Sequence, residues 1–163
     1  MIELTVKRAL GLAAKRAGDK IALRCGHRHM THRELDVASN RLGRVLLSKG
    51  LTRGQRVAVV LPNCMEYVAI AIACAKAGLT MVTLNYRFTT NEYAIQLQDC
   101  AAELLIYDAA YMESVVPAAQ QAGVKYFWGR GFCAQDHESL ELIMQSGDSN
   151  DLDNSVSEMD VFY

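Results

Sequence analysis

The sequence predicts an α/β fold with a mostly parallel sheet, flanking helices and an N-terminal β-hairpin. Short apolar segments alternate with segments of helical length, a pattern typical of strands joined by crossover helices. The run 56–61 is apolar almost throughout, as expected of a strand buried on both faces of a parallel sheet. With 163 residues, 51% of them hydrophobic, the chain can build one domain with a substantial core.

The N-terminal segment predicts a helix followed by the hairpin. Thr5 can cap a helix that reaches Ala17, with apolar residues recurring along one side. Residues 20–25 then show a period of two, 26–27 form a turn and 28–31 return. This pattern is that of two antiparallel strands.

The helix after the hairpin has both of its ends marked in the sequence. Thr31 and Glu34 fit a capping box, in which the threonine oxygen and the glutamate carboxylate each accept a hydrogen bond from a backbone amide of the first turn. Lys49 and Gly50 supply a cationic last turn and a residue suited to the left-handed C-terminal position.

Strands and helices then alternate to the end of the predicted sheet. The predicted strands span 56–61, 79–84, 103–107 and 124–128, and the predicted helices span 64–77, 89–100 and 109–122. The helix at 64–77 is apolar nearly all round, which indicates a buried position. Thr89 and Glu92 form a second capping box. Pro117 is expected to kink the last helix or to begin a second piece, because proline lacks the amide proton and crowds the preceding turn.

Charge is distributed unevenly along the chain. All 17 Lys and Arg residues lie at or before Arg130, together with 10 acidic residues, so residues 1–130 carry a net charge of +7. The remaining 8 acidic residues lie after Arg130. A basic face could attract phosphate-bearing ligands or nucleic acid. The alternative is a set of solvated helix faces, some of them neutralised by further residues of a longer protein. We expect no nucleic-acid partner.

Cysteine usage and the N-terminus favour the cytosol. The five cysteines are odd in number, widely spaced and mostly in apolar surroundings, which suits reduced buried thiols; they are Cys25, Cys64, Cys74, Cys100 and Cys133. No secretory signal is visible, and no apolar run approaches the length of a transmembrane segment.

Three histidines form the only metal-like cluster. His27, His29 and His32 could converge on a transition metal. His32 falls at a helix start, however, so its ring points away from the other two, and a solvated or packed role is the preferred interpretation. We therefore predict no metal site. The chain also lacks the glycine-rich phosphate loops and the nucleophile elbow that would indicate nucleotide binding or acyl transfer by its own residues.

Five segments, in order, resemble the opening third of the adenylate-forming enzymes, the acyl-CoA synthetases and their relatives. The first resembles that family's Leu-Thr-Tyr-x-Glu-Leu motif, with Met30 and His32 as substitutions, and the third resembles its Leu-Lys-Ala-Gly-Ala motif. The segments are 29–35, 53–63, 75–85, 85–92 and 99–106. In that family a segment such as 160–163, which follows the polar linker 147–155 and is expected to be the first half of a strand, leads into a Thr-Ser-Gly-Thr-Thr-Gly loop that holds the ATP phosphates.

The resemblance implies a chain, 1–163, that is the incomplete N-terminal subdomain of an AMP-binding ligase and stops before that loop. It implies an enzyme that uses ATP, Mg²⁺ and coenzyme A to activate a carboxylic acid as an acyl-adenylate and to transfer it to a thiol. None of the catalytic groups lies in these residues, so the chain alone is expected to be inactive and to bind no cofactor well. A cytoplasmic location is implied, peripheral to a membrane if the substrate is a long-chain fatty acid, and a homodimer is left open.

One residue is assigned a role by this resemblance. Arg87 occupies a position where some aryl- and acyl-CoA ligases present an arginine to the nucleotide phosphate of coenzyme A, and a guanidinium suits bidentate phosphate contact. The alternative is a surface arginine or a salt bridge beside a helix. For the whole chain, the open alternatives are an adenylating enzyme of the peptide-synthetase or luciferase type and a non-catalytic α/β interaction module.

Overall fold

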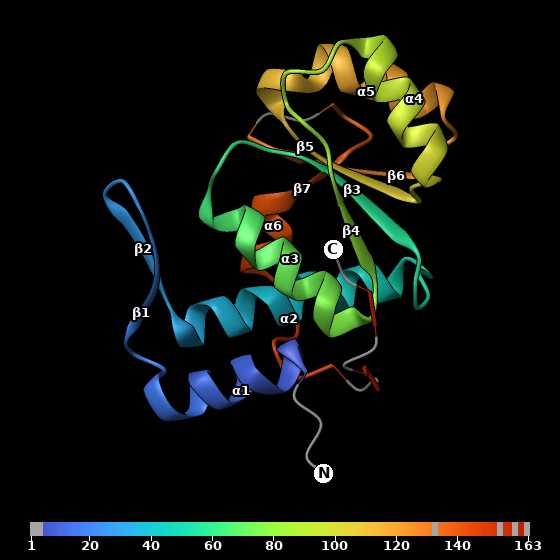
Figure 1. The fold of residues 1–163 in the computed structure, drawn as a ribbon. Helices are drawn as coiled ribbons and strands as arrows, with labels where there is room; N and C mark the ends of the chain where they lie inside the picture. Colours follow the sequence, from blue (N-terminus) through green and yellow to red (C-terminus); the bar gives the residue numbers. More distant parts are fainter. Residues whose placement is uncertain (1–4, 132–133, 153–154, 158–159, 162–163) are drawn as a thin grey trace.

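The computed structural model describes residues 5–131, 134–152, 155–157 and 160–161. Helices and strands alternate along the chain, as the sequence predicts (Figure 1). The helices are α1 (Val6–Ala17), α2 (His32–Ser48), α3 (Met65–Ala77), α4 (Thr90–Cys100), α5 (Met112–Gln121) and α6 (Leu140–Gln145), with a 3₁₀ turn η1 (Ala109–Tyr111). The strands are β1 (Ile21–Cys25), β2 (Arg28–Thr31), β3 (Arg56–Val60), β4 (Thr80–Thr83), β5 (Leu104–Asp108), β6 (Tyr126–Arg130) and β7 (Glu138–Ser139).

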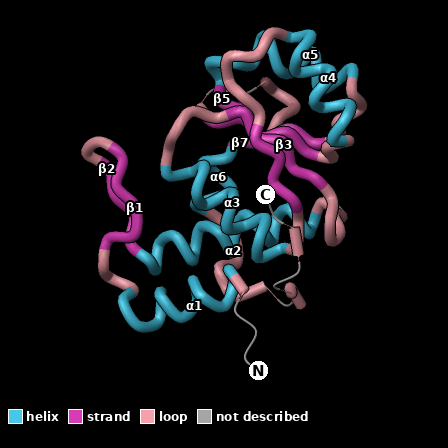
Figure 2. The backbone as a smooth tube through the Cα atoms, in the orientation of Figure 1, coloured by secondary structure: helices cyan, strands magenta, loops and turns pink. Residues whose placement is uncertain are grey.

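Five of the strands form one parallel sheet in the order β4-β3-β5-β6-β7. Val57 of β3 lies between Met81 of β4 and Leu104 of β5, which fixes the register of the centre. The antiparallel pair β1-β2 is separate from this sheet and projects from the body of the molecule (Figure 2). The predicted fold class, a mostly parallel sheet with an N-terminal hairpin, is confirmed.

Helices cover both faces of the sheet (Figure 1). Val57 and Val59 pack toward α2, α3 and α6, whereas Ala58 and Val60 pack toward α4 and α5. All four side chains are fully buried, because successive residues of a strand point to opposite faces. This burial on both sides explains why the sequence of β3 shows no polar alternation.

The capping boxes predicted for α2 and α4 are both present. The Thr31 side chain accepts from the Glu34 amide while the Glu34 carboxylate accepts from the Thr31 amide, and Thr89 and Glu92 make the same pair of bonds. Of the two outcomes expected at Pro117, a kink or the start of a second piece, the second does not occur. The break falls earlier, between η1 and α5, and α5 continues through Pro117.

Two further expectations need correction. Of the described cysteines only Cys74 is buried, whereas Cys25 is exposed and Cys64 and Cys100 are half-buried; Cys133 lies outside the described residues. The predicted strand at 160–163 is not formed by Asp160 and Val161, and its other two residues lie outside the described part. Within the described residues, the helices are too short and too polar to cross a membrane.

The acidic C-terminal segment neutralises part of the basic surface. Arg44 of α2 pairs with Asp148 at 3.4 Å, and Lys49 pairs with Glu138 at 2.5 Å. Backbone carbonyls of the same segment accept hydrogen bonds from both α1 and α2. Lys7 Nζ of α1 donates to Leu152 O at 2.5 Å, and Arg44 Nη2 of α2 donates to Asn150 O at 2.9 Å. Acidic residues after Arg130 therefore neutralise some of the basic residues that precede it.

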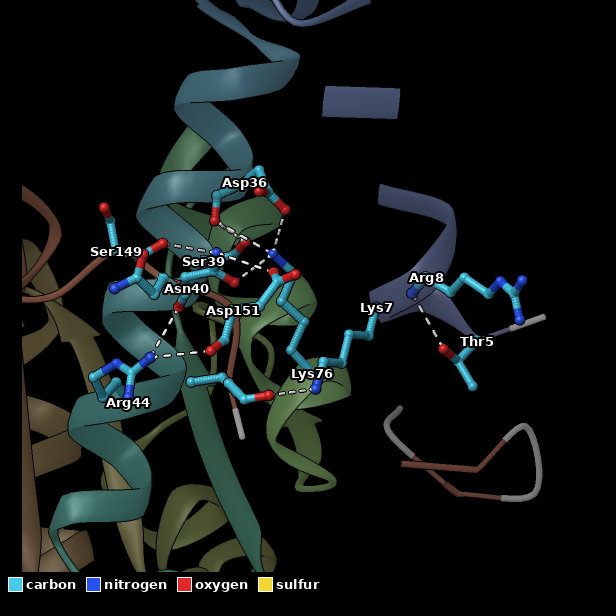
Figure 3. Close-up of polar contacts among 12 residues, drawn as sticks. Thr5, Lys7, Arg8, Asp36, Ser39, Asn40, Arg44, Lys76, Ser149 and Asp151 are labelled. Carbon is cyan, nitrogen blue, oxygen red and sulfur yellow. Dashed lines mark hydrogen bonds and ion pairs between the residues drawn. The ribbon is translucent and has the colours of Figure 1, made fainter. Parts of the chain in front are cut away.

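A buried lysine joins α2 and α3 beneath this segment (Figure 3). The Lys76 side chain is fully buried, and its Nζ donates to Asp36 Oδ1 at 2.6 Å and to Asn40 Oδ1 at 2.7 Å. The Asn40 amide in turn donates to Ser149 O at 3.0 Å. Burial lowers the pKa of Lys76, and the hydrogen bond and charge of Asp36 oppose this shift.

Candidate functional site

The carboxyl ends of the parallel strands meet at one edge of the sheet. The connection from β3 leads to β4 on one side, whereas the connection from β5 leads to β6 on the other. The direction of winding thus reverses between β3 and β5. Ligands of open α/β sheets bind outside the carboxyl ends of the strands at such a reversal. This edge is therefore the candidate functional site.

A chain of four alternating charges lies at this edge. Asp108, the last residue of β5, pairs with Arg130, the last residue of β6. Arg130 Nε lies 3.7 Å from Glu66 Oε2 in the first turn of α3, and Glu66 Oε1 accepts from Arg28 Nη2 of the hairpin at 2.6 Å. Four elements that are far apart in the sequence are thereby joined at one place.

Burial and the neighbouring arginines act in opposite directions on the pKa of Glu66. The Glu66 side chain is 8% exposed and that of Asp108 15%, whereas that of Arg28 is 63% exposed. Burial acts to raise the pKa of Glu66, but the hydrogen bond from Arg28 and the charges of Arg28 and Arg130 outweigh it and leave the pKa below its usual value. Glu66 is therefore ionised at neutral pH, and the four groups hold the hairpin, α3 and the two strands together.

A cavity of about 650 Å³ opens beside Glu66 and Arg28. It lies between the hairpin, α2, the start of α3 and α6. Methionines line it together with charged residues and two of the three predicted histidines, namely His27, Arg28, His29, Met30, Glu34, Arg41, Met65, Glu66, Glu141 and Met144. His32 begins α2 and does not line this cavity. Among the residues that the structure describes, no group of three His, Cys, Asp or Glu side chains is arranged to hold a metal ion.

Arg87 lies at the same edge of the sheet, in the loop that follows β4. Its side chain is exposed, and its guanidinium carbon lies 5.5 Å from the centre of the Tyr86 ring. The Arg87 amide donates to Asn85 Oδ1 at 3.0 Å, and the Tyr86 ring is 5.5 Å from that of Tyr111. Within the described part of the chain, no carboxylate forms an ion pair with Arg87. The Arg87 guanidinium thus lies beside the Tyr86 ring at the carboxyl edge of the sheet and is open to solvent.

The role assigned to Arg87 stays a prediction, and the four linked charges were not anticipated from the sequence. Arg28, Glu66, Asp108 and Arg130 belong to four different elements, so no local spacing links them. One signal was present: Asp108 and Arg130 are each the charged last residue of an apolar strand, and the ends of neighbouring parallel strands lie side by side.

The open parallel sheet places this chain among the α/β domains, and its charged carboxyl edge is the position at which such domains bind ligands. Residues 11–155 match the family described as AMP-binding enzyme, and the chain belongs to this family. The resemblance deduced from the five segments is thereby confirmed.

Several curated relatives are ligases of coenzyme A. The chain is 34% identical over 99 residues to 3-hydroxybenzoate–CoA/4-hydroxybenzoate–CoA ligase of Thauera aromatica, a match that covers 61% of this chain and 19% of the relative. It is 38% identical over 79 residues to acetyl-coenzyme A synthetase of Rhodobacter capsulatus, covering 48% of this chain and 12% of the relative. These matches span about a fifth or less of the relatives' length.

Solved structures show the same fold. A long-chain-fatty-acid-CoA ligase of Archaeoglobus fulgidus superposes with a TM-score of 0.84 at 23% identity, over 98% of this chain and 33% of that chain. A fatty acyl CoA synthetase of Mycobacterium tuberculosis superposes with a TM-score of 0.82 at 23% identity, over 96% of this chain and 31% of that one. The five-stranded parallel sheet with its flanking helices is therefore shared with these enzymes.

Proposed function

We propose that this chain is the N-terminal part of an AMP-forming acid–thiol ligase, an acyl-CoA synthetase that activates a carboxylic acid with ATP and transfers it to coenzyme A. The observation that carries the proposal is the family match over residues 11–155, together with curated relatives that are CoA ligases. Because the chain spans only part of those relatives, the proposal assigns catalysis, Mg²⁺ binding and the choice of acid to the whole enzyme. A cytoplasmic enzyme fits this proposal, attached peripherally to a membrane if its acid is a long-chain fatty acid.

The position of residues 160–161 supports the proposal that the ATP-binding loop of the family follows this segment. Thr80, the first residue of β4, donates through Oγ1 to Val161 O at 2.8 Å, and Asp160 pairs with Arg53. Residues 160–161 therefore lie beside the start of the edge strand. A continuation parallel to β4 would end at the carboxyl edge, and we propose that it delivers the Thr-Ser-Gly-Thr-Thr-Gly loop there. Backbone amides of such a loop would bind the ATP phosphates.

Arg87 is the residue of this chain that we propose to bind coenzyme A. Its guanidinium is exposed, rests near the Tyr86 ring and has no carboxylate partner in the described residues, so it is available to a phosphate. Coenzyme A supplies the thiol that accepts the acyl group. The role of Arg87 would be to hold the nucleotide end of this molecule, away from the reacting sulfur.

The test is a full-length Arg87→Ala enzyme. We expect the KM for coenzyme A to rise about tenfold, as for the loss of one charged hydrogen bond, while the KM for ATP stays unchanged. Arg24→Ala, which removes an exposed arginine of the hairpin, is the matched control. An unchanged KM for coenzyme A in Arg87→Ala would exclude this role and leave the ligase assignment standing.

The ligase assignment has a separate test. The full-length enzyme should exchange pyrophosphate into ATP when a carboxylic acid is present, before any coenzyme A is added. The 163-residue chain should neither catalyse this exchange nor gain thermal stability from ATP, coenzyme A or fatty acids. A reading frame that stops at residue 163, or a full-length protein without acid-dependent exchange, would favour the interaction module instead. Transfer to an acceptor other than coenzyme A would indicate a different adenylating enzyme.

A further inference from the structure

The contact between the hairpin and the start of α3 brings two cysteines to one small cavity. Cys25 is the last residue of β1, and Cys64 is the residue that precedes the first turn of α3. Both line a cavity of about 170 Å³, together with apolar side chains that include Leu23 and Val68. Cys25 Sγ lies 4.0 Å from Asn63 O, the carbonyl of the peptide bond that joins Asn63 to Cys64.

The register of the hairpin holds Cys25 in this position. Cys25 is the direct partner of Arg28 across the two strands, so both side chains lie on the same face of the hairpin. Arg28 bonds Glu66 at 2.6 Å, only two residues beyond Cys64. An ion pair and a thiol contact thus fasten the same face of the hairpin to the same turn of α3.

The two thiols differ in their environment. Cys25 is exposed and open to a reagent in solution, whereas Cys64 is half-buried. Burial raises the pKa of Cys64, and the nearby charge of Glu66 acts in the same direction. An exposed attacking thiol beside a shielded second thiol is the arrangement of an attacking and a resolving cysteine.

We propose that Cys25 and Cys64 form a reversible disulfide by exchange with a small disulfide such as oxidised glutathione. The Cys25 thiolate attacks one sulfur of oxidised glutathione, forms a mixed disulfide and releases one glutathione thiolate. Cys64 loses its proton to solvent and attacks the Cys25 sulfur, which releases the second glutathione. Two protein thiols are oxidised, and one glutathione disulfide is reduced to two thiols. The new bond fixes the hairpin, and with it Arg28, against Glu66 at the candidate site.

The experiment treats the 163-residue chain with oxidised glutathione, blocks the remaining thiols and maps the disulfides by mass spectrometry of peptides. We expect Cys25–Cys64 as the dominant intramolecular link, reversed by dithiothreitol. Cys64→Ser should accumulate the mixed disulfide on Cys25. Cys100→Ser, which removes a half-buried thiol on α4 at the opposite face of the sheet, should leave the Cys25–Cys64 link unchanged.

The same reaction in concentrated urea provides the control for folding. A disulfide needs Cα atoms within about 7 Å, so the preference for Cys64 should disappear when the tertiary contact is lost. If the native chain gives the same mixture of links as the chain in urea, or if Cys25 stops at the mixed disulfide while Cys64 is present, the proposal is wrong. This test does not depend on ligase activity.

Discussion

Among Lys76 and its partners Asp36 and Asn40, loss of the Asp36 carboxylate should lower the stability of the fold most (Figure 3). The Lys76 side chain has no exposed surface, whereas that of Asp36 is 18% exposed. Asp36→Ala removes the carboxylate that bonds the fully buried ammonium and leaves the charge of Asp151 to act on it. Breaking a buried pair by removing one partner costs about 3–5 kcal/mol. The acceptors that remain include Asn40 Oδ1 at 2.7 Å and the backbone oxygen of residue 36 at 3.3 Å. We therefore expect about 3 kcal/mol, the low end of that range.

The reciprocal change should be milder. Lys76→Met leaves the Asp36 carboxylate, which can turn its exposed part to water, so we expect a cost of about 1–2 kcal/mol. The double variant Asp36→Ala/Lys76→Met removes both charges and should be more stable than Asp36→Ala alone, because an apolar replacement of a buried pair is often nearly neutral.

Urea unfolding can be followed through the fluorescence of Trp128, the only tryptophan and a fully buried one. With a denaturant dependence of roughly 2 kcal/mol per molar urea, the midpoint should fall by about 1.5 M for Asp36→Ala and by about 0.5–1 M for Lys76→Met. A double variant as unstable as the sum of the single changes, or an Asp36→Ala midpoint no lower than that of Lys76→Met, would refute the reasoning.

The cost of Asp36→Ala should also depend on pH. Burial lowers the pKa of Lys76 below its usual 10.5, so between the folded and unfolded values the unfolded chain binds more protons and stability rises with pH. Without Asp36 the pKa of Lys76 falls further, so Lys76 loses its charge at a lower pH than in the parent chain. The variant therefore begins to regain stability at that lower pH. The difference from the parent chain should therefore shrink from about pH 7 toward about pH 10.

Three further predictions follow from single contacts. In Gly43→Ala the new Cβ would lie 2.7 Å from Leu152 Cδ1 and 3.3 Å from Ala73 O, and this crowding opposes the gain of about 1 kcal/mol that alanine brings to a helix interior. We therefore expect a net loss of stability of at most about 1 kcal/mol. Urea midpoints should show a more favourable effect of Gly43→Ala in a Leu152→Ala background, and an equal effect in both backgrounds would exclude the clash with Leu152. Thr31→Ala should lower the free energy of unfolding by about 1 kcal/mol, because it removes the N-terminal cap of α2. Urea unfolding measures this loss, and Thr31→Ser, which keeps a hydroxyl cap, should retain most of the stability. Burial lowers the pKa of His137 below its usual 6.5, so stability should fall as pH drops through the window below 6.5, and His137→Asn should flatten that slope; an unchanged slope would contradict the assignment.

Much of the fold was predictable because its signals are local. The continuous apolar run of β3 and the two capping boxes each depend on neighbouring residues, and the structure confirms them. No second helical piece begins at Pro117, because the start of α5 is set earlier, where β5 ends at Asp108 and the 3₁₀ turn η1 follows.

The candidate site was predictable only at Arg87, whose role rests on a resemblance and remains a proposal. The chain of charges from Arg28 to Asp108 could not be predicted, because its members come from four elements with no common spacing. The same holds for Cys25 and Cys64, which are 39 positions apart in the sequence and share a cavity only because the hairpin packs on α3.

The sequence by itself determined the alternation of strands and helices, their caps and the family, since these depend on side-chain order along the chain. Only the tertiary structure decided which strand ends lie together, which charges pair and where the acidic C-terminal segment lies. The physical reason is that strand order and long-range ion pairs depend on how separate apolar faces pack together. Lys76 illustrates the division: its sequence neighbours place it in an apolar helix, but its partners Asp36 and Asn40 lie on another helix, which reaches it only in the folded core.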